Sequence, residues 1–313
     1  MAEAAVETAA APWALLAAVL LGALALGAAC LDGVLAACAE GVPARVGLRA
    51  PVARTAALLR QRRRTTVAAD GLLQRAGGGG LVVAALLMVA VVPLGGHALA
   101  DLPAGVVWFN AMDVLVWALV WLAGWGGDSA LALVGGYRFL AQALAYELPL
   151  MFALTAPAVA AGSLRVADVA AAQDGLWHVV WMPVAFAVYC AGVVAFSVQG
   201  PFAPPAGLDL AGGVLTEASG ADRLLLQAGR YALLAAGAAF AVPLFLGGGA
   251  GPLLPGWAWV LLKAGLLLAA LVVLRRRVPA VRPDRFLEAG WLVLLPAVLL
   301  QLLVVAVVVV GRG

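Results

Sequence analysis

The stretch FLAQALAYELPLMFALTAPAVAA, residues 139–161, decides the fold, because it is an apolar run long enough to cross a bilayer and holds one charged side chain, Glu147. The whole chain has the same character: 65% of its residues are hydrophobic, 11% are charged, and the mean hydropathy is +1.07. Soluble domains carry roughly 25% charged residues. The sequence therefore predicts an all-α polytopic membrane protein with a single membrane domain over residues 1–313.

Further apolar runs, each bounded by Gly, Pro or an arginine cluster, bring the number of predicted transmembrane helices to about eight. The predicted spans are residues 12–37, 80–96, 106–124, 139–161, 176–196, 224–246, 257–274 and 289–310. Most arginines then fall on one side, in loops 38–79, 125–138, 197–223 and 275–288. Because positive residues in short loops stay in the cytoplasm, these loops are predicted to be cytoplasmic and both termini to lie outside, in a bacterial inner membrane.

The formal charge of +3 follows from these loops, so nucleic acid is not a predicted partner. Cys30, Cys38 and Cys190 are far apart and form no CxxC pair, so the sequence predicts no metal site and no disulfide framework. Segment 40–79 mixes apolar and basic residues in a partly helical pattern, which is typical of a helix on the membrane surface. It serves either as a topogenic loop beside anionic lipid or as a docking surface.

Residues 122–149, LAGWGGDSALALVGGYRFLAQALAYELP, resemble the H subunit of respiratory complex I, in which an AGW motif, a GA-x-R helix start and a YE-[IL]-P ending recur. The order and spacing of further motifs agree with that family over most of the chain. These motifs are VPARVG (42–47), AVVPLG (90–95), AGSLRVADV (161–169), GPF (200–202) and TEASG (216–220).

The resemblance implies a membrane subunit of a proton-translocating NADH-quinone oxidoreductase, which anchors the peripheral redox arm and forms part of the quinone chamber. The chain would be an enzyme only as a subunit, since it binds no cofactor alone, takes quinone as substrate and leaves the iron–sulfur clusters and FMN to partner subunits. The expected partners are the other subunits, quinone and membrane lipid. Two alternatives stay open: a homologous subunit anchors membrane-bound nickel–iron hydrogenases and formate hydrogenlyase, and an independent secondary transporter is a third class.

Ionisable residues inside apolar spans are candidate proton carriers, because placing a charge in lipid is costly. Glu147 precedes Pro149 and matches the YE-[IL]-P motif, so we predict a relay carboxylate; the alternative is a carboxylate at a helix end that reaches the interface. Further relay candidates are Asp113 and Glu217, and the predicted intramembrane counter-charges are Arg230 and Lys263. By the resemblance, the quinone-chamber residues are Arg45, Arg138, Asp209 and Phe202, with Arg138 opening the fourth helix.

The loop after the fifth span departs from the family pattern. Phe196 stands where the family has a glutamate, and Ala203 and Ala206 replace two more acids. Arg230 takes the place of another glutamate. Losing several acids together weakens a proton relay more than one substitution does, so we expect the anchoring role to persist and the coupling to be weakened.

Overall fold

The quoted stretch lies in the longest helix, α5 (Ala130–Ala161), of a computed structural model that describes residues 6–312. This helix begins well before the predicted span, so Arg138 lies inside it and does not open it. The earlier residues are themselves apolar, and Gly135 lets the backbone of a following loop pack directly against the helix. The predicted loop 125–138 is therefore mostly helical.

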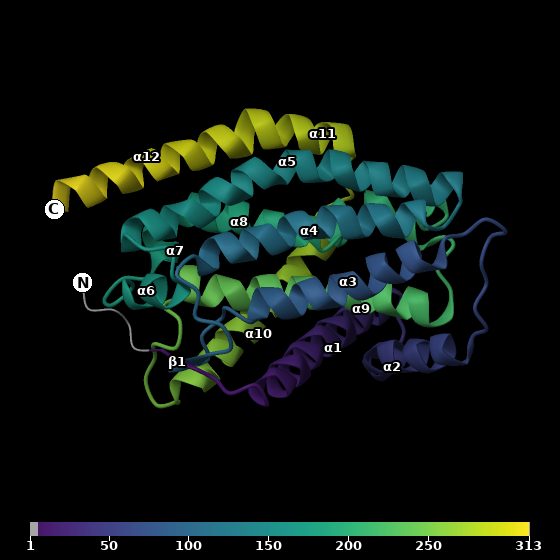
Figure 1. The fold of residues 1–313 in the computed structure, drawn as a ribbon, viewed down its shortest axis with the longest axis horizontal. Coiled ribbons are helices and arrows are strands. Elements are labelled where there is room, and N and C mark those ends of the chain that lie inside the picture. Colours follow the sequence, from purple (N-terminus) through teal and green to yellow (C-terminus); the bar gives the residue numbers. More distant parts are fainter. Residues whose placement is uncertain (1–5, 313) are drawn as a thin grey trace.

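Helices form most of the remaining chain (Figure 1). They are α1 (Trp13–Ala39), α2 (Ala44–Arg60), α3 (Gly71–Val89), α4 (Gly105–Trp125), α6 (Val166–Ala171), α7 (His178–Trp181), α8 (Pro183–Phe196), α9 (Gly220–Phe245), α10 (Gly256–Arg277), α11 (Pro283–Ala289) and α12 (Leu295–Arg312). A π-helical turn, η5 (Gly290–Leu294), joins α11 to α12. Four 3-10 turns follow α8: η1 (Gly200–Phe202), η2 (Pro204–Ala206), η3 (Leu208–Leu210) and η4 (Gly213–Leu215). Two short parallel strands, β1 (Glu7–Thr8) and β2 (His97–Ala98), pair with Glu7 opposite His97.

By length and composition, seven helices in the described residues can cross a membrane: α1, α3, α4, α5, α9, α10 and the continuous segment 283–311. The predicted all-α polytopic fold is confirmed. The predicted fifth span, however, is not one long helix, because it divides into α7 and α8 at Met182. Pro183 starts α8, where its missing amide is tolerated, and α8 is a shorter apolar helix of 14 residues.

α3 lies earlier in the chain than the span predicted at 80–96. The Asp70 carboxylate caps its first turn by accepting hydrogen bonds from the amides of Leu72 (2.9 Å) and Leu73 (3.2 Å). Glycines 77–80 remain helical because most of them let α4 or α9 approach closely, as small residues do between membrane helices. The predicted loop 38–79 therefore contains the whole of α2 and the start of α3.

The helices form a bundle in which α9 is almost entirely buried, whereas α1 and the 283–311 segment bury few of their residues (Figure 1). α12 packs along α5 at one edge, and α2 packs on α1 at the opposite edge. Hydrogen bonds join the loop after α2 to the loops before α9 and α5, and join the loop after α10 to η1. These four loops, 61–70, 126–129, 197–219 and 278–282, together with the arginines in the last turns of α2 and α10, form what we call the arginine-rich end.

Candidate functional site

Two carboxyl groups meet in the middle of the bundle. Asp113 of α4 is completely buried and Glu147 of α5 is 8% exposed, and the two are close enough to interact directly. The Tyr146 hydroxyl donates a hydrogen bond to Asp113 Oδ1 (3.3 Å), and the Asn110 amide donates to Glu147 Oε1 (3.1 Å). We call Asp113 and Glu147 the carboxyl pair. Because α5 continues past Pro149 to Ala161, Glu147 does not lie at a helix end.

The surroundings of the carboxyl pair suit proton exchange. Asp113 Oδ2 and Glu147 Oε2 are buried without a hydrogen-bond partner in the described structure, as is the Trp117 indole nitrogen. Two adjacent carboxyl groups can share one proton, so a proton can pass from one side chain of the pair to the other. A buried pair of this kind is costly in a membrane protein and usually marks a functional site.

The two predicted intramembrane counter-charges, Lys263 and Arg230, bond to backbone carbonyls rather than to the carboxyl pair. Lys263 donates hydrogen bonds to the carbonyls of Leu246 (2.7 Å), Gly248 (2.9 Å) and Ala250 (2.8 Å), just beyond the end of α9. Arg230 donates to the Val198 carbonyl at the end of α8. Both cations are held by backbone oxygens that a helix end leaves free, a contact that hydropathy does not reveal.

Replacing Lys263 by methionine is expected to destabilise the bundle. The change leaves three backbone carbonyls after α9 without their donor, at a cost on the order of 3 kcal/mol in the free energy of unfolding. Thermal denaturation of the detergent-purified protein measures this as a lower melting temperature. The exposed neighbour Trp257 offers a control, since Trp257→Phe on the same helix should change little. Equal melting temperatures for both variants would contradict the capping role.

The loop 197–215 is seated on the first half of α5. The Arg138 guanidinium pairs with the Asp209 carboxylate (2.5 Å) and holds the pKa of that carboxyl below its usual range. The link is therefore present at neutral pH and is lost only as the pH falls through that lowered pKa. The buried Gln142 amide donates to the carbonyls of Ala195 (2.8 Å) and Phe202 (3.1 Å). Two predicted chamber residues, Arg138 and Asp209, thus meet. A third, Phe202, contacts Gln142, which lies one turn further along α5.

Gln142 is a residue that sequence reasoning missed. It follows Arg138 by four positions and precedes Tyr146 by four, so the three side chains form one polar stripe along α5. The four-residue spacing of these polar side chains within an otherwise apolar run could have indicated Gln142 from the sequence. The stripe leads from the seated loop toward the carboxyl pair.

The other two predicted residues lie elsewhere. Glu217 is half-buried at the arginine-rich end, with its side chain near Gly127 just beyond α4. From there to Asp113 is about 18 Å along α4. Arg45 is exposed in the first turn of α2. The structure therefore brings neither residue into the carboxyl pair.

A second polar cluster surrounds Asp32 of α1. Its carboxylate accepts a hydrogen bond from the Tyr231 hydroxyl (2.8 Å) and pairs with Arg275 (2.8 Å) and Arg276 (2.7 Å) of α10. Arg275 also donates to the side chain of Gln199, next to the seated loop. The sequence signal that was overlooked is a lone aspartate within an apolar span, which requires a partner.

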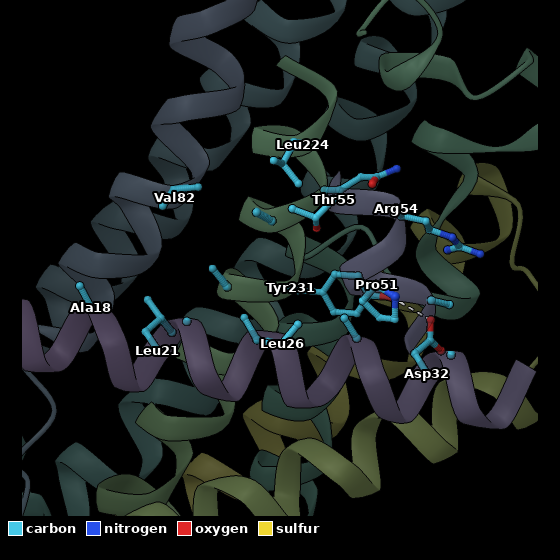
Figure 2. Close-up of a pocket in the computed structure, with 18 of the residues that line it drawn as sticks. Ala18, Leu21, Leu26, Asp32, Pro51, Arg54, Thr55, Val82, Leu224 and Tyr231 are labelled. Atoms are coloured by element: carbon cyan, nitrogen blue, oxygen red, sulfur yellow. Dashed lines mark hydrogen bonds between the residues drawn. The ribbon is translucent and has the colours of Figure 1, made fainter. Parts of the chain in front are cut away.

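A cavity of about 390 Å³ opens between α1, α2, α3 and α9 and reaches this cluster. In Figure 2, Ala18, Leu21 and Leu26 lead along α1 to Asp32, and Arg54 of α2 lies toward the same end. The lining runs along α1 from Ala18 to Ala36, about 27 Å at the rise of an α-helix. The cavity is therefore long and mostly apolar, with charged and hydroxyl-bearing side chains at one end.

Fold and site together define a polytopic membrane protein with a buried carboxyl pair and an elongated apolar cavity that ends in charged side chains. The family model for NADH dehydrogenase matches residues 39–306. The second NADH-quinone oxidoreductase H subunit of Cereibacter sphaeroides is 40% identical over 69% of this chain and 68% of its own length. The namesake subunit of Geobacter sulfurreducens is 35% identical over 69% of each chain. The chain belongs to the NADH dehydrogenase family that includes the H subunit of NADH-quinone oxidoreductase.

Membership confirms the resemblance and the main functional expectation. The homologues are membrane subunits of bacterial complex I, an oxidoreductase and translocase whose redox cofactors lie in other subunits, so this chain is not catalytic alone. The relatives compared, which include the first H subunit of Rhodopseudomonas palustris at 36% identity over 71% of this chain and 70% of its own, do not favour a hydrogenase anchor or an independent transporter.

Proposed function

We propose that the cavity takes up the apolar tail of a quinone, that the arginine-rich end docks the peripheral redox arm, and that the carboxyl pair carries protons. The observation that supports this most strongly is the presence, in one subunit of this family, of both an elongated cavity and a buried carboxyl pair. The first suits the substrate of the complex and the second suits its translocase activity.

The cavity suits a quinone because the two share one polarity pattern. A quinone has a long apolar tail and a compact head with two carbonyl acceptors, and the cavity is apolar along α1 with Arg54 and Thr55 at its polar end. The Tyr231 hydroxyl is already committed to Asp32, whereas Arg54 and Thr55 of α2 carry donors for an acceptor group. Electrons come from partner subunits, so this chain binds and orients the substrate.

The arginine-rich end suits docking to an acidic face of the peripheral arm. Arg60, Arg62 and Arg64 are exposed, whereas Arg63 is tied to Asp222 by an ion pair of 2.6 Å. This pairing fixes the segment while the other side chains remain available to a partner. The same concentration of arginine supports an orientation with this end in the cytoplasm and both termini outside.

The carboxyl pair supports a proton relay that has fewer carboxylates in the loop seated on α5 than the family pattern has. The loop seated on α5 contacts that helix through Arg138 and Gln142. At two loop positions where the family pattern has acids, this chain has Ala203 and Ala206. Proton transfer to and from the pair therefore depends on α5 itself more than on loop carboxylates. We propose that translocation persists at reduced efficiency.

Charge reversal tests the docking role. Converting Arg60, Arg62 and Arg64 to glutamate, with Arg63 kept, is expected to release the peripheral arm from washed membranes, because like charges now face each other across the interface. Retention is measured as membrane-bound NADH dehydrogenase activity at low and moderate salt.

The matched control is the conversion of the same three residues to lysine, which keeps their positive charge. We expect it to retain the arm. Equal retention in both variants would show that the 60–64 segment is passive. Purified wild-type complex without an NADH-oxidising arm would overturn the proposed function as a whole.

A further inference from the structure

The π-helical turn η5 packs against α5 where α5 has its own defect. Pro149 has no amide hydrogen, so the carbonyl of Ala145 lacks its usual helical donor. Gly290, the first residue of η5, lies directly on that carbonyl, and a Cβ added to Gly290 would collide with it. The Trp291 indole donates a hydrogen bond to the neighbouring Leu144 carbonyl (3.1 Å). Two irregular turns, one on each helix, therefore dock on each other.

This contact falls on the turn of α5 that carries the carboxyl pair. Leu144 and Ala145 directly precede Tyr146, which bonds to Asp113, and Glu147. Rotation or translation of α5 at Ala145 must therefore change the distance between the two carboxyl groups. Because π-helical turns can shift register and are frequent at functional sites, η5 is suited to such a change.

The other end of the same segment contacts the seated loop. Phe286 of α11 is buried and its ring lies 4.3 Å from that of Phe202, centroid to centroid. Just before α11, the Val281 amide donates a hydrogen bond to the Pro201 carbonyl (2.8 Å). Residues 281–291 therefore connect the start of the loop to the Pro149 turn of α5.

The loop is in turn connected to the polar end of the cavity. Gln199 accepts a hydrogen bond from Arg275, which pairs with Asp32 on the cavity wall. Gly200 adopts a positive φ of 53° and leaves no room for a Cβ beside Arg275. A contiguous series of packed groups thus runs from the cavity through the loop and α11 to the carboxyl pair.

We infer that residues 281–291 are a positioning segment. Phe286 packs on the loop, and Gly290 fixes the position of the α5 turn around Pro149 that carries Glu147. This inference rests on the proposed function, since it assigns the segment to the coupling between cavity and pair. Coupling between two sites can be carried by contiguous packed side chains and hydrogen bonds, such as those of residues 281–291. Neither Phe286 nor Gly290 lines the cavity.

Gly290→Ala tests the inference in the assembled complex. We expect the ratio of protons translocated to quinone reduced to fall about threefold, while the quinone reductase rate changes less than the ratio. Gly265→Ala on α10 is the matched control, because its Cβ meets no atom within 4 Å. Trp291→Phe, which removes the indole donor and keeps an aromatic ring at this position, is expected to lower the ratio in the same direction with the fold intact.

A spectroscopic measurement separates positioning from general damage. The infrared carbonyl band of the protonated carboxyl pair, identified by its loss in Glu147→Gln, is expected to shift in Gly290→Ala and to remain unchanged in Gly265→Ala. An unchanged ratio and band in both Gly290→Ala and Trp291→Phe would overturn the inference. A wild-type complex that neither reduces quinone nor moves protons would instead refute the proposed function.

Discussion

Exchanging Glu147 for glutamine is expected to remove most proton translocation by the assembled complex while assembly persists. Glutamine has nearly the shape of glutamate and can keep the contact with Asn110, but it cannot accept the transferred proton. The rate of translocation should fall by about tenfold or more, because a positioned proton-transfer group contributes roughly 100-fold or more to such a step. Proton uptake by inverted membrane vesicles, with quinone reduction followed in parallel, measures the effect.

Asp113→Asn is expected to have a similar effect, and the double variant should add little, because both side chains act as one unit. Asp174, exposed on the loop before α7, provides the control, since Asp174→Asn changes a carboxylate far from the pair. Glu217→Gln distinguishes the relay candidates: its distance from the pair predicts a smaller loss than Glu147→Gln. Full translocation by Glu147→Gln would eliminate the pair as the proton carrier.

Filling the cavity is expected to abolish quinone reduction without disrupting the complex. Ala25 lines the cavity on α1, and Ala25→Trp places a large ring in a space of about 390 Å³. An isoprenoid tail then has no room, so the rate of quinone reduction should fall by about tenfold or more, the loss expected when an apolar site is closed to its ligand. NADH oxidation with a water-soluble artificial acceptor should remain, because the redox arm does not use this cavity.

Val19→Trp serves as the matched control, because Val19 lies on the same helix, is 66% exposed and does not line the cavity. A short-tailed quinone analogue adds a second comparison, since it should be affected less by Ala25→Trp than a long-tailed substrate. Normal reduction of the long-tailed quinone by Ala25→Trp would show that the tail binds elsewhere.

The sequence predicted the membrane helices and placed Glu147 within one of them, because both depend on properties that each residue carries by itself. An apolar run must be buried in lipid, and an ionisable side chain within it needs a partner or a function. The helix bounds were less accurate. Gly77 and Gly135 read as breaks in the chain, yet they are helical because neighbouring backbone packs against them.

The partners of the charged residues could not be predicted from sequence. Lys263 and Arg230 were predicted as intramembrane counter-charges from their position in apolar spans, whereas the structure gives them backbone carbonyls near helix ends. The Asp32 cluster joins α1 to α10 across more than two hundred intervening residues, so no local pattern marks it. Hydropathy gives the depth of a residue in the membrane and carries no information about which helices are neighbours.

The apolar runs of the sequence by themselves determined that this is a polytopic membrane protein, and the stretch 139–161 placed an ionisable residue within a span, because lipid selects for apolar length whatever the neighbours. Only the tertiary structure decided that Glu147 meets Asp113, that the Pro149 turn receives Gly290, and that a cavity ends at Asp32. Each of these is a contact between helices distant in the chain, and it depends on packing, which a single span does not encode.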